Sequence, residues 1–354
     1  MRLVTITAIL LSAVAGCAPA SSSSETSTGT APSAPSGRAA LVAGSTVELL
    51  NVSYDPTREL WKELNAAFIP AYKAEKGVDV TIKPSHAASG AQARAIMDGQ
   101  QADVATLSLF PDTDALREAG LIKEGWADHF PNRSLPYTST VVFVVRAGNP
   151  KGIKDWADLV KDGVEIVTPN PKTSGNGRMS FLGAWGSVVI NGGSEADAQE
   201  FVRKFYKNAP VLDTGARGST TTFAQKGQGD VHITMENEAY LEQKESPGKF
   251  EIIYPSISFF HEPHVAIVDK VVDKKGTREV AEAYLKFLYT PEGQEIIAKN
   301  YFRPTDPAVR EKHKADFPEI KTFDITAVAK DWKEAQTRFF GDGGLFEVIS
   351  QPVE

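Results

Sequence analysis

Thr168-Pro-Asn-Pro-Lys-Thr-Ser-Gly-Asn-Gly-Arg178 is the stretch that decides how this sequence is interpreted. The apolar, β-branched run 164–168 predicts a short buried strand, which Pro169 and Pro171 end. The segment 179–190 predicts a helix despite its two glycines. A strand, a glycine-rich loop and a helix start direct free backbone N–H groups and the positive end of the helix dipole toward one point. The loop holds neutral donors and no carboxylate. We therefore expect a site for a small, fully ionised anion; an ordinary turn before a capped helix is the alternative.

The first residues predict export. Met1-Arg2, an apolar run over 3–14 and then Ala15-Gly16-Cys17 have the layout of a secretory signal peptide. Its apolar part is too short to span a bilayer. Val14-Ala-Gly-Cys17 resembles a bacterial lipobox, which would make 1–17 a lipoprotein signal peptide and Cys17 the lipidated first residue of the mature protein. An ordinary cleaved signal with an incidental cysteine is the alternative. Because Cys17 is the only cysteine, a disulfide framework and thiol catalysis are excluded.

Composition separates a tether from a folded part. Residues 18–38 are almost entirely Ser, Thr, Ala, Pro and Gly, which cannot form a core, so we expect a flexible tether over 18–45. The remaining residues are enough for two lobes with separate cores. A net charge of −7 argues against nucleic acid and anionic membrane surfaces as partners. It would also repel an anion at long range, so anion binding must depend on local donors.

The folded part alternates strands and helices. The expected strands are 46–53, 78–82, 102–108, 138–146, 164–168, 211–212, 230–236, 252–254 and 265–268. The first expected helix starts at Asp55-Pro56, with Asp55 as its N-cap and Pro70 as an early kink or end. Ser89 would cap a helix over 91–97, and Ser219 would cap one over 219–226. The other expected helices are one from Pro111-Asp112 to about 119, 179–190, 196–207, 238–244, 277–290 and 327–340. This alternation implies α/β architecture with parallel βαβ units and ligand sites beyond the carboxyl ends of the strands. We expect one lobe over 46–138 and 259–354, with a second lobe, 139–258, inserted into it.

Four loops could meet at one cleft between these lobes. They contain Asp55, Ser89 with Gly90, Ser174 to Arg178, and Gly215 to Ser219. Serine and aspartate are common N-caps in any α/β protein, and that explanation is sufficient for one loop. Four such loops occur in the two lobes, and Arg178 and Arg217 follow the glycine-rich ones. From these residues alone, an anion-binding cleft and a set of ordinary helix caps are equally supported.

Other chemistry is sparsely supported. His261-Glu-Pro-His264 offers two metal ligands, but its proline and strand context disrupt a helical pair, so we expect neither metal nor cofactor. No Gly-x-Ser-x-Gly elbow surrounds the serines named above. Asp55, Asp112 and His86 or His232 could be imagined as a hydrolase set, yet no pattern brings them together. An anion-dependent hydrolase or lyase, and a sensory or adhesive surface protein, remain the competing classes.

Longer motifs extend the interpretation to nearly the whole folded part. They are residues 49–60, 136–140, 168–172, 215–220, 236–238, 268–276 and 291–294. They resemble the periplasmic sulfate-binding proteins, the substrate-binding subunits of ATP-driven sulfate/thiosulfate importers, over about residues 47–350. The resemblance implies a type II periplasmic-binding fold: two α/β lobes joined by hinge strands that close over the ligand. It also implies a solute-binding protein that delivers sulfate or thiosulfate to a membrane permease and is not an enzyme. Together with the lipobox-like Cys17, this leads us to expect a monomeric, membrane-anchored lipoprotein.

In that family, uncharged donors hold a dehydrated sulfate. Matching motifs imply that the ligand-binding positions are Ser89, Gly90, Ser174, Gly175, Asn176, Ala216 and Met235. Asp55, Asp112, Arg178 and Arg217 would hold the peptide donors in place and balance charge without touching the anion. Sulfate only accepts hydrogen bonds, whereas hydrogen phosphate brings an O–H that a site made of donors leaves unpaired, at a cost of roughly 1–3 kcal/mol.

Two positions depart from the family pattern. Met235 stands where the family usually has a tryptophan whose indole N–H reaches the anion, and a thioether cannot donate. Asn176 stands where the family often has glycine. Asn tolerates a left-handed backbone, and its side chain could add an N–H donor. Our hypothesis is that Asn176 partly replaces the indole donor; a site retuned to thiosulfate, molybdate or another oxyanion is the alternative.

Overall fold

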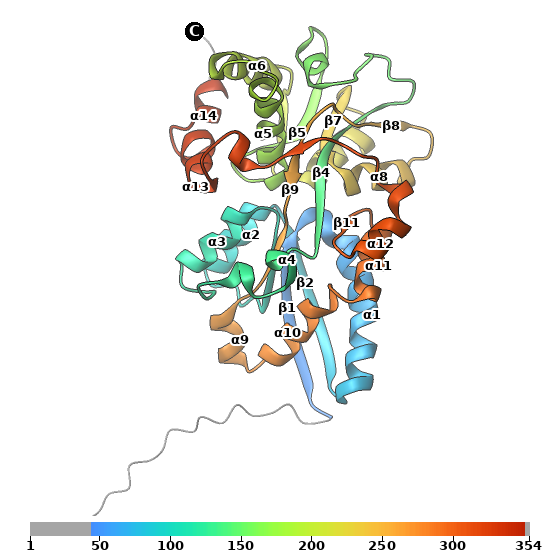
Figure 1. Ribbon diagram of the computed structural model, residues 1–354, viewed down its shortest axis with the longest axis vertical. Coiled ribbons are helices and arrows are strands. Elements are labelled where there is room, and N and C mark those ends of the chain that lie inside the picture. The colour runs from blue at the N-terminus through green and yellow to red at the C-terminus, as the bar shows by residue number, and fades with distance from the viewer. Residues whose placement is uncertain (1–43, 351–354) are drawn as a thin grey trace, which may run out of the picture. The chain divides into compact units, whose positions relative to one another are not determined.

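The structure, a computed structural model, describes residues 44–350 (Figure 1). The strands are β1 (Thr46–Tyr54), β2 (Asp79–Ala87), β3 (Val104–Leu107), β4 (Tyr137–Arg146), β5 (Ile166–Pro169), β6 (Val211–Asp213), β7 (Val231–Met235), β8 (Phe250–Ile253), β9 (Ser258–His261), β10 (His264–Ile267), β11 (Arg303–Pro304) and β12 (Thr322–Phe323). The helices are α1 (Arg58–Lys76), α2 (Ser89–Met97), α3 (Phe110–Glu118), α4 (Pro131–Ser134), α5 (Gly175–Val189), α6 (Glu195–Lys207), α7 (Ala216–Thr220), α8 (Glu236–Glu245), α9 (Asp269–Lys275), α10 (Arg278–Phe287), α11 (Pro291–Lys299), α12 (Pro307–Lys312), α13 (Trp332–Ala335) and α14 (Leu345–Ser350). The expected signal peptide, Cys17 and nearly all of the expected tether lie outside the described residues.

The first sheet has the order β10-β3-β1-β2. β1 pairs in parallel with both β2 and β3, and β10 pairs antiparallel with β3. α1 packs against β2, and α2 and α3 pack against β3. Helices cover the faces of a parallel sheet, and accordingly all four residues of β3 are buried. The loops that lead into α1, α2 and α3 therefore lie beyond one edge of this sheet.

The second sheet has the order β12-β9-β4-β7-β5-β6. β5 pairs in parallel with β6 and β7, whereas β4 pairs antiparallel with β7, β8 and β9. Figure 1 shows this sheet with α5, α6 and α8 above the first sheet and its helices. The chain crosses between the sheets three times: before β4, between β9 and β10, and between β10 and β11.

The last helices pack on the second sheet's helices. Phe346 of α14 contacts Tyr206 of α6, and Phe339 and Phe340 contact Phe181 of α5. β11 and β12 also join the second sheet, next to β4 and β9. The division into lobes 46–138 with 259–354 and 139–258 stays a proposal, and the helices after residue 330 contact the part that the sequence assigns to the inserted lobe.

Several expected helix boundaries were wrong. α1 continues through Pro70 to Lys76. Pro70 lies on the exposed side, so water can take the place of the backbone hydrogen bond that proline removes. α5 begins at Gly175 rather than at residue 179, and α7 begins at Ala216 rather than at Ser219. The glycine-rich loops are thus the first turns of helices, which brings their N–H groups into the site.

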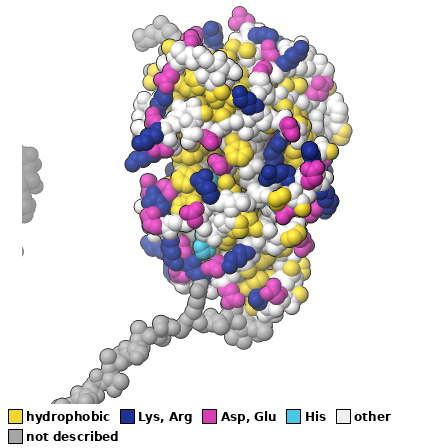
Figure 2. Space-filling view, viewed as in Figure 1, with side chains coloured by type: hydrophobic (Ala, Val, Ile, Leu, Met, Phe, Trp, Pro, Cys, Tyr) yellow, Lys and Arg dark blue, Asp and Glu magenta, His cyan; other side chains and the backbone are white. Residues whose placement is uncertain are grey.

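The described surface carries both signs of charge. Figure 2 shows acidic and basic side chains interspersed over one face of the molecule, with no large patch of a single sign. Among residues 44–350, no helix combines the length and apolarity needed to cross a membrane.

Candidate functional site

A small cavity gathers most of the residues that the sequence nominates. It is lined by Tyr54, Asp55, Pro56, Ala88, Ser89, Ser108, Ser174, Gly175, Asn176, Ala216 and Met235. Its volume of about 10 Å³ is close to the least that admits a water molecule. The lining comes from the starts of α2, α5 and α7 and of the short 3-10 turn Asp55–Thr57 that precedes α1. The 3-10 turn and α2 follow strands of the first sheet, whereas α5 and α7 follow strands of the second.

The start of α5 supplies donors from the second sheet's side. Ser174 is its N-cap, and the Ser174 hydroxyl oxygen accepts the Gly177 N–H at 3.4 Å. The N–H groups of Gly175 and Asn176, the first two residues of the helix, have no partner within it. A Cβ on Gly177 would lie 2.5 Å from the Pro169 carbonyl oxygen, so only glycine lets the loop turn this tightly. Both free N–H groups border the cavity, with the positive end of the dipole of α5 behind them.

The start of α2 supplies donors from the first sheet's side. Ser89 is the first residue of α2 and does not act as the expected side-chain cap. Its hydroxyl donates to Asp112 Oδ2 at 2.6 Å and accepts the Ser108 backbone N–H at 2.9 Å. Since a carboxylate only accepts, the Ser89 proton is already committed. Ser89 can therefore offer a cavity ligand its backbone N–H but not its hydroxyl. Gly90 does not line this cavity; it borders a larger groove beside it.

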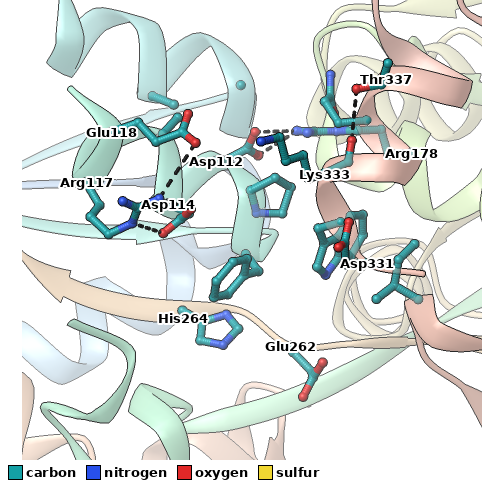
Figure 3. A pocket seen from close by; sticks show the side chains of 18 of the residues that line it. Asp112, Asp114, Arg117, Glu118, Arg178, Glu262, His264, Asp331, Lys333 and Thr337 are labelled. Carbon is teal, nitrogen blue, oxygen red and sulfur yellow. Dashed lines mark hydrogen bonds and ion pairs between the residues drawn. The ribbon is translucent and has the colours of Figure 1, made fainter. Parts of the chain in front are cut away.

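Asp112 and Arg178 form a buried ion pair between α3 and α5 (Figure 3). Arg178 Nη2 donates to Asp112 Oδ1 at 2.7 Å and Oδ2 at 2.6 Å, and the two side chains are only 6% and 8% exposed. Both residues border the larger groove of about 830 Å³, whose lining is of mixed charge. Because Ser89 lines the small cavity and bonds to Asp112, the pair lies between the groove and the cavity. The pair joins α3 to α5 beside the cavity.

Arg217 of α7 forms ion pairs with a helix of the first sheet and a helix of the second sheet. Its guanidinium contacts Glu59 of α1 at 3.0 Å and the fully buried Glu238 of α8 at 3.0 Å. Burial raises the pKa of Glu238 to about 7, although the Arg217 charge opposes the shift. The Thr220 hydroxyl also donates to Glu238 Oε2 at 3.0 Å. Arg217 lines neither pocket, so it acts on the cavity only through the position of α7.

Asp55 differs from its expected role as an N-cap. Its side chain makes no cap hydrogen bond and instead accepts from Arg58 Nη2 at 2.7 Å. A Cβ on Gly215, which precedes α7, would lie 2.6 Å from Asp55 Oδ2. The glycine thus lets the loop before α7 approach the 3-10 turn that precedes α1. Ala216, the first residue of α7, places its N–H at the cavity for the same reason.

Met235 and Asn176 both line the cavity. Met235 is fully buried at the end of β7 and offers no donor. The Asn176 side chain donates from Nδ2 to the Ile233 carbonyl oxygen at 3.2 Å, and its Oδ1 has no partner. One of the two N–H bonds of Asn176 Nδ2 is therefore directed at β7, and the other has no protein acceptor among the described residues. That Asn176 partly replaces an indole donor stays a hypothesis.

Four lining residues were not nominated from the sequence: Tyr54, Pro56, Ala88 and Ser108. Ser108 directly follows β3, whose end meets the same sheet edge as the ends of β1 and β2. That position is the signal that could have identified it, but the sequence assigned Ser108 to the strand itself. Ser108 is 1% exposed, so its polar atoms must find partners in the protein or in the cavity.

The paired histidines, His261 and His264, are both buried. Among the described residues, no group of three or more His, Asp or Glu side chains is placed to hold an ion. His261 is fully buried on β9, and burial lowers its pKa to about 3; burial also lowers the pKa of His264 to about 4. Both rings are therefore neutral near pH 7.

Comparison with known proteins identifies relatives along nearly the whole described part. Residues 57–303 match the family model described as bacterial extracellular solute-binding protein. The chain is 53% identical to the sulfate-binding protein of Escherichia coli over 307 residues, which are 86% of this chain and 93% of that protein. It is also 53% identical to the thiosulfate-binding protein of Pseudomonas aeruginosa over 306 residues, 86% of this chain and 92% of that one.

Solved structures of bacterial binding proteins also resemble this chain. The sulfate-binding protein of Mycobacterium tuberculosis superposes with a TM-score of 0.73 at 31% identity, covering 83% of this chain and 99% of that one. A periplasmic thiamin-binding protein, at 19% identity and a TM-score of 0.58, covers 75% of this chain and 86% of its own. The second likeness concerns the fold alone.

Proposed function

Because the chain belongs to the sulfate-binding proteins among the bacterial extracellular solute-binding proteins, we propose that it captures sulfate outside the cytoplasm and delivers it to an ATP-driven importer. The type II periplasmic-binding fold expected from the sequence is confirmed. The relatives are binding proteins. We extend this to the present chain and propose that it catalyses no reaction.

One observation supports sulfate above other solutes: the small cavity is bordered by first-turn N–H groups of helices from both sheets. Ser89, Gly175, Asn176 and Ala216 each present such a group. A compact dianion can accept bonds from all of them, and helix dipoles add to the attraction. Because the donors are fixed by their helices before the ligand arrives, little reorganisation opposes binding.

Selectivity against phosphate follows from the proton count of the ligand. Hydrogen phosphate carries one O–H, which needs an acceptor in a dry site. Both carboxylates near the cavity are engaged by arginines, Asp55 Oδ1 by Arg58 and Asp112 by Arg178. We propose that neither carboxylate turns toward a bound anion, so that the phosphate proton is left unpaired, at a cost of roughly 1–3 kcal/mol.

Thiosulfate is the second candidate ligand. Met235 gives the cavity a soft, polarisable thioether in place of a donor, which suits a terminal sulfur better than an oxygen. A thiosulfate-binding relative at 53% identity supports the same reading. The relatives favour neither molybdate nor an anion sensor without transport.

We further propose that the mature protein is a monomer that begins at a lipidated Cys17 and is joined to the membrane by the tether 18–45. The lipobox-like Val14-Ala-Gly-Cys17 supports this anchor. Replacing Cys17 by serine should release the exported protein from the membrane fraction in cells. Retention of the Cys17→Ser protein in that fraction would exclude the anchor.

Titration calorimetry tests the ligand directly. The purified protein, freed of bound anion by unfolding and refolding, is titrated with sulfate, thiosulfate, molybdate and phosphate. We expect tight binding of sulfate, measurable binding of thiosulfate and no heat from phosphate. Binding of phosphate as tight as sulfate, or no binding of sulfate, would overturn the proposal.

A further inference from the structure

Ser108 occupies an unusual position in the anion cavity. It follows β3 in the first sheet, yet a Cβ on Gly175 would lie 2.5 Å from its Oγ. The Ser108 hydroxyl therefore lies against the first residue of α5, on the other side of the cleft. Its side chain is buried and lines the cavity. No motif in the sequence singles it out.

The hydrogen bonds of Ser108 depend on His261. His261 Nε2 lies 2.8 Å from the Ser108 carbonyl oxygen and 3.1 Å from Ser108 Oγ. A carbonyl oxygen can only accept, so Nε2 must carry the proton of the neutral imidazole. Nδ1 is then the bare nitrogen, and it has no partner in the described structure. The edge-to-face contact of the His261 ring with Tyr54, 5.7 Å between centroids, helps to hold this orientation.

This tautomer determines what the Ser108 hydroxyl can do. Because Nε2 carries a proton, it cannot accept one from Ser108, so Oγ is an acceptor in that contact. The hydrogen bonds of the described residues give the Ser108 O–H no other acceptor. A buried O–H without an acceptor is costly, and the cavity is the space that it borders.

We propose that Ser108 is a further specificity-determining residue of the anion site, whose hydroxyl donates to the bound anion. The inference rests on the proposed function and deepens it. Ser108 supplies the side-chain donor that Met235 cannot, and it does so from the opposite side of the cleft. The Ser89 hydroxyl, by contrast, already donates its hydrogen bond to Asp112. His261 is a positioning residue that keeps Ser108 in the donating state.

The test compares three variants of the full chain by calorimetry with sulfate. Ser108→Ala should bind sulfate about 10- to 150-fold more weakly, the range expected for losing a hydrogen bond to a charged group. Ser108→Cys keeps the approximate volume but offers only a weak S–H donor, so it should remain weak. Ser258→Ala, a buried serine of β9 whose hydroxyl bonds to the Val141 carbonyl oxygen, is the matched control and should bind as the wild type does.

The outcomes separate this inference from the proposed function. If the wild type binds sulfate and Ser108→Ala binds equally well, Ser108 is not a donor, and the sulfate site stands without it. Recovery in Ser108→Cys would show that volume rather than the proton matters and would also overturn the inference. Failure of the wild type to bind sulfate would overturn the proposed function itself.

A double-mutant cycle tests the positioning role of His261. His261→Phe should weaken sulfate binding in the wild-type background but have little further effect in Ser108→Ala, because its action passes through that hydroxyl. A purely structural role for His261 predicts the same loss in both backgrounds. Equal losses would therefore contradict the positioning role. Should His261→Phe fail to fold, the Ser108 variants still decide the donor.

Discussion

The buried pair of Asp112 and Arg178 allows the sharpest prediction about how the cleft works. Asp112 belongs to α3 and Arg178 to α5, so the pair forms only when the two sides are close. In Arg178→Met, closure would leave the Asp112 carboxylate buried with only the Ser89 hydroxyl as a donor. Breaking such a pair costs about 3–5 kcal/mol. The family resemblance implies that the cleft closes over the ligand, so we expect this cost to appear as a sulfate affinity lower by roughly 150- to 5,000-fold.

Two further variants show whether the unpaired Asp112 charge causes the loss of sulfate affinity. In Asp112→Asn/Arg178→Met the buried charge is removed together with its partner, so most of the lost affinity should return. Arg117→Met breaks a half-buried pair with Asp114, which borders the same groove but not the small cavity, and should leave sulfate affinity unchanged. Calorimetry at fixed ionic strength measures all three. Wild-type affinity in Arg178→Met would refute the reasoning, and a double variant as weak as Arg178→Met would mean that Arg178 attracts the anion directly.

The remaining predictions concern three other positions. Gly175→Ala should weaken sulfate binding by at least about a hundredfold in calorimetry, because its Cβ would meet Ser108 Oγ at 2.5 Å, and unchanged affinity would place these two residues farther apart. Glu59→Gln should lower sulfate affinity by no more than about fivefold, since the Glu59 side chain in its pair with Arg217 is 42% exposed; a hundredfold loss would contradict this. Burial raises the pKa of Glu238 from 4.5 to about 7, so the folded state holds a proton that the unfolded state has lost between these pH values. The free energy of unfolding should therefore fall as pH rises through that window, by up to about 1.4 kcal/mol per pH unit. Urea titrations should show a smaller fall for Glu238→Gln than for the wild type. The same pH dependence in both proteins would exclude Glu238 as its source.

The sequence was informative wherever a local rule applies. A β-branched run followed by Pro169 and a glycine-rich loop predicted a strand and then a helix, and β5 and α5 lie there, although α5 begins at Gly175, four residues earlier than expected. The same rule, applied to each strand end, nominated Ser89, Gly175 and Ala216, which line one cavity. Parallel strands bring their carboxyl ends to one edge of a sheet, so the order of elements along the chain already indicates where a site lies.

Only the tertiary structure decided which hydroxyl protons remain available for a ligand. The Ser89 hydroxyl donates its hydrogen bond to Asp112, 23 residues away, whereas we propose that His261, 153 residues away, leaves the Ser108 hydroxyl free to donate to a ligand. Likewise, Phe346 packs on Tyr206 although the two are far apart in the chain. The sequence by itself determined the backbone donors, because helix starts are local. The direction of each hydroxyl depends on an acceptor from a distant segment, and only folding brings that segment into place.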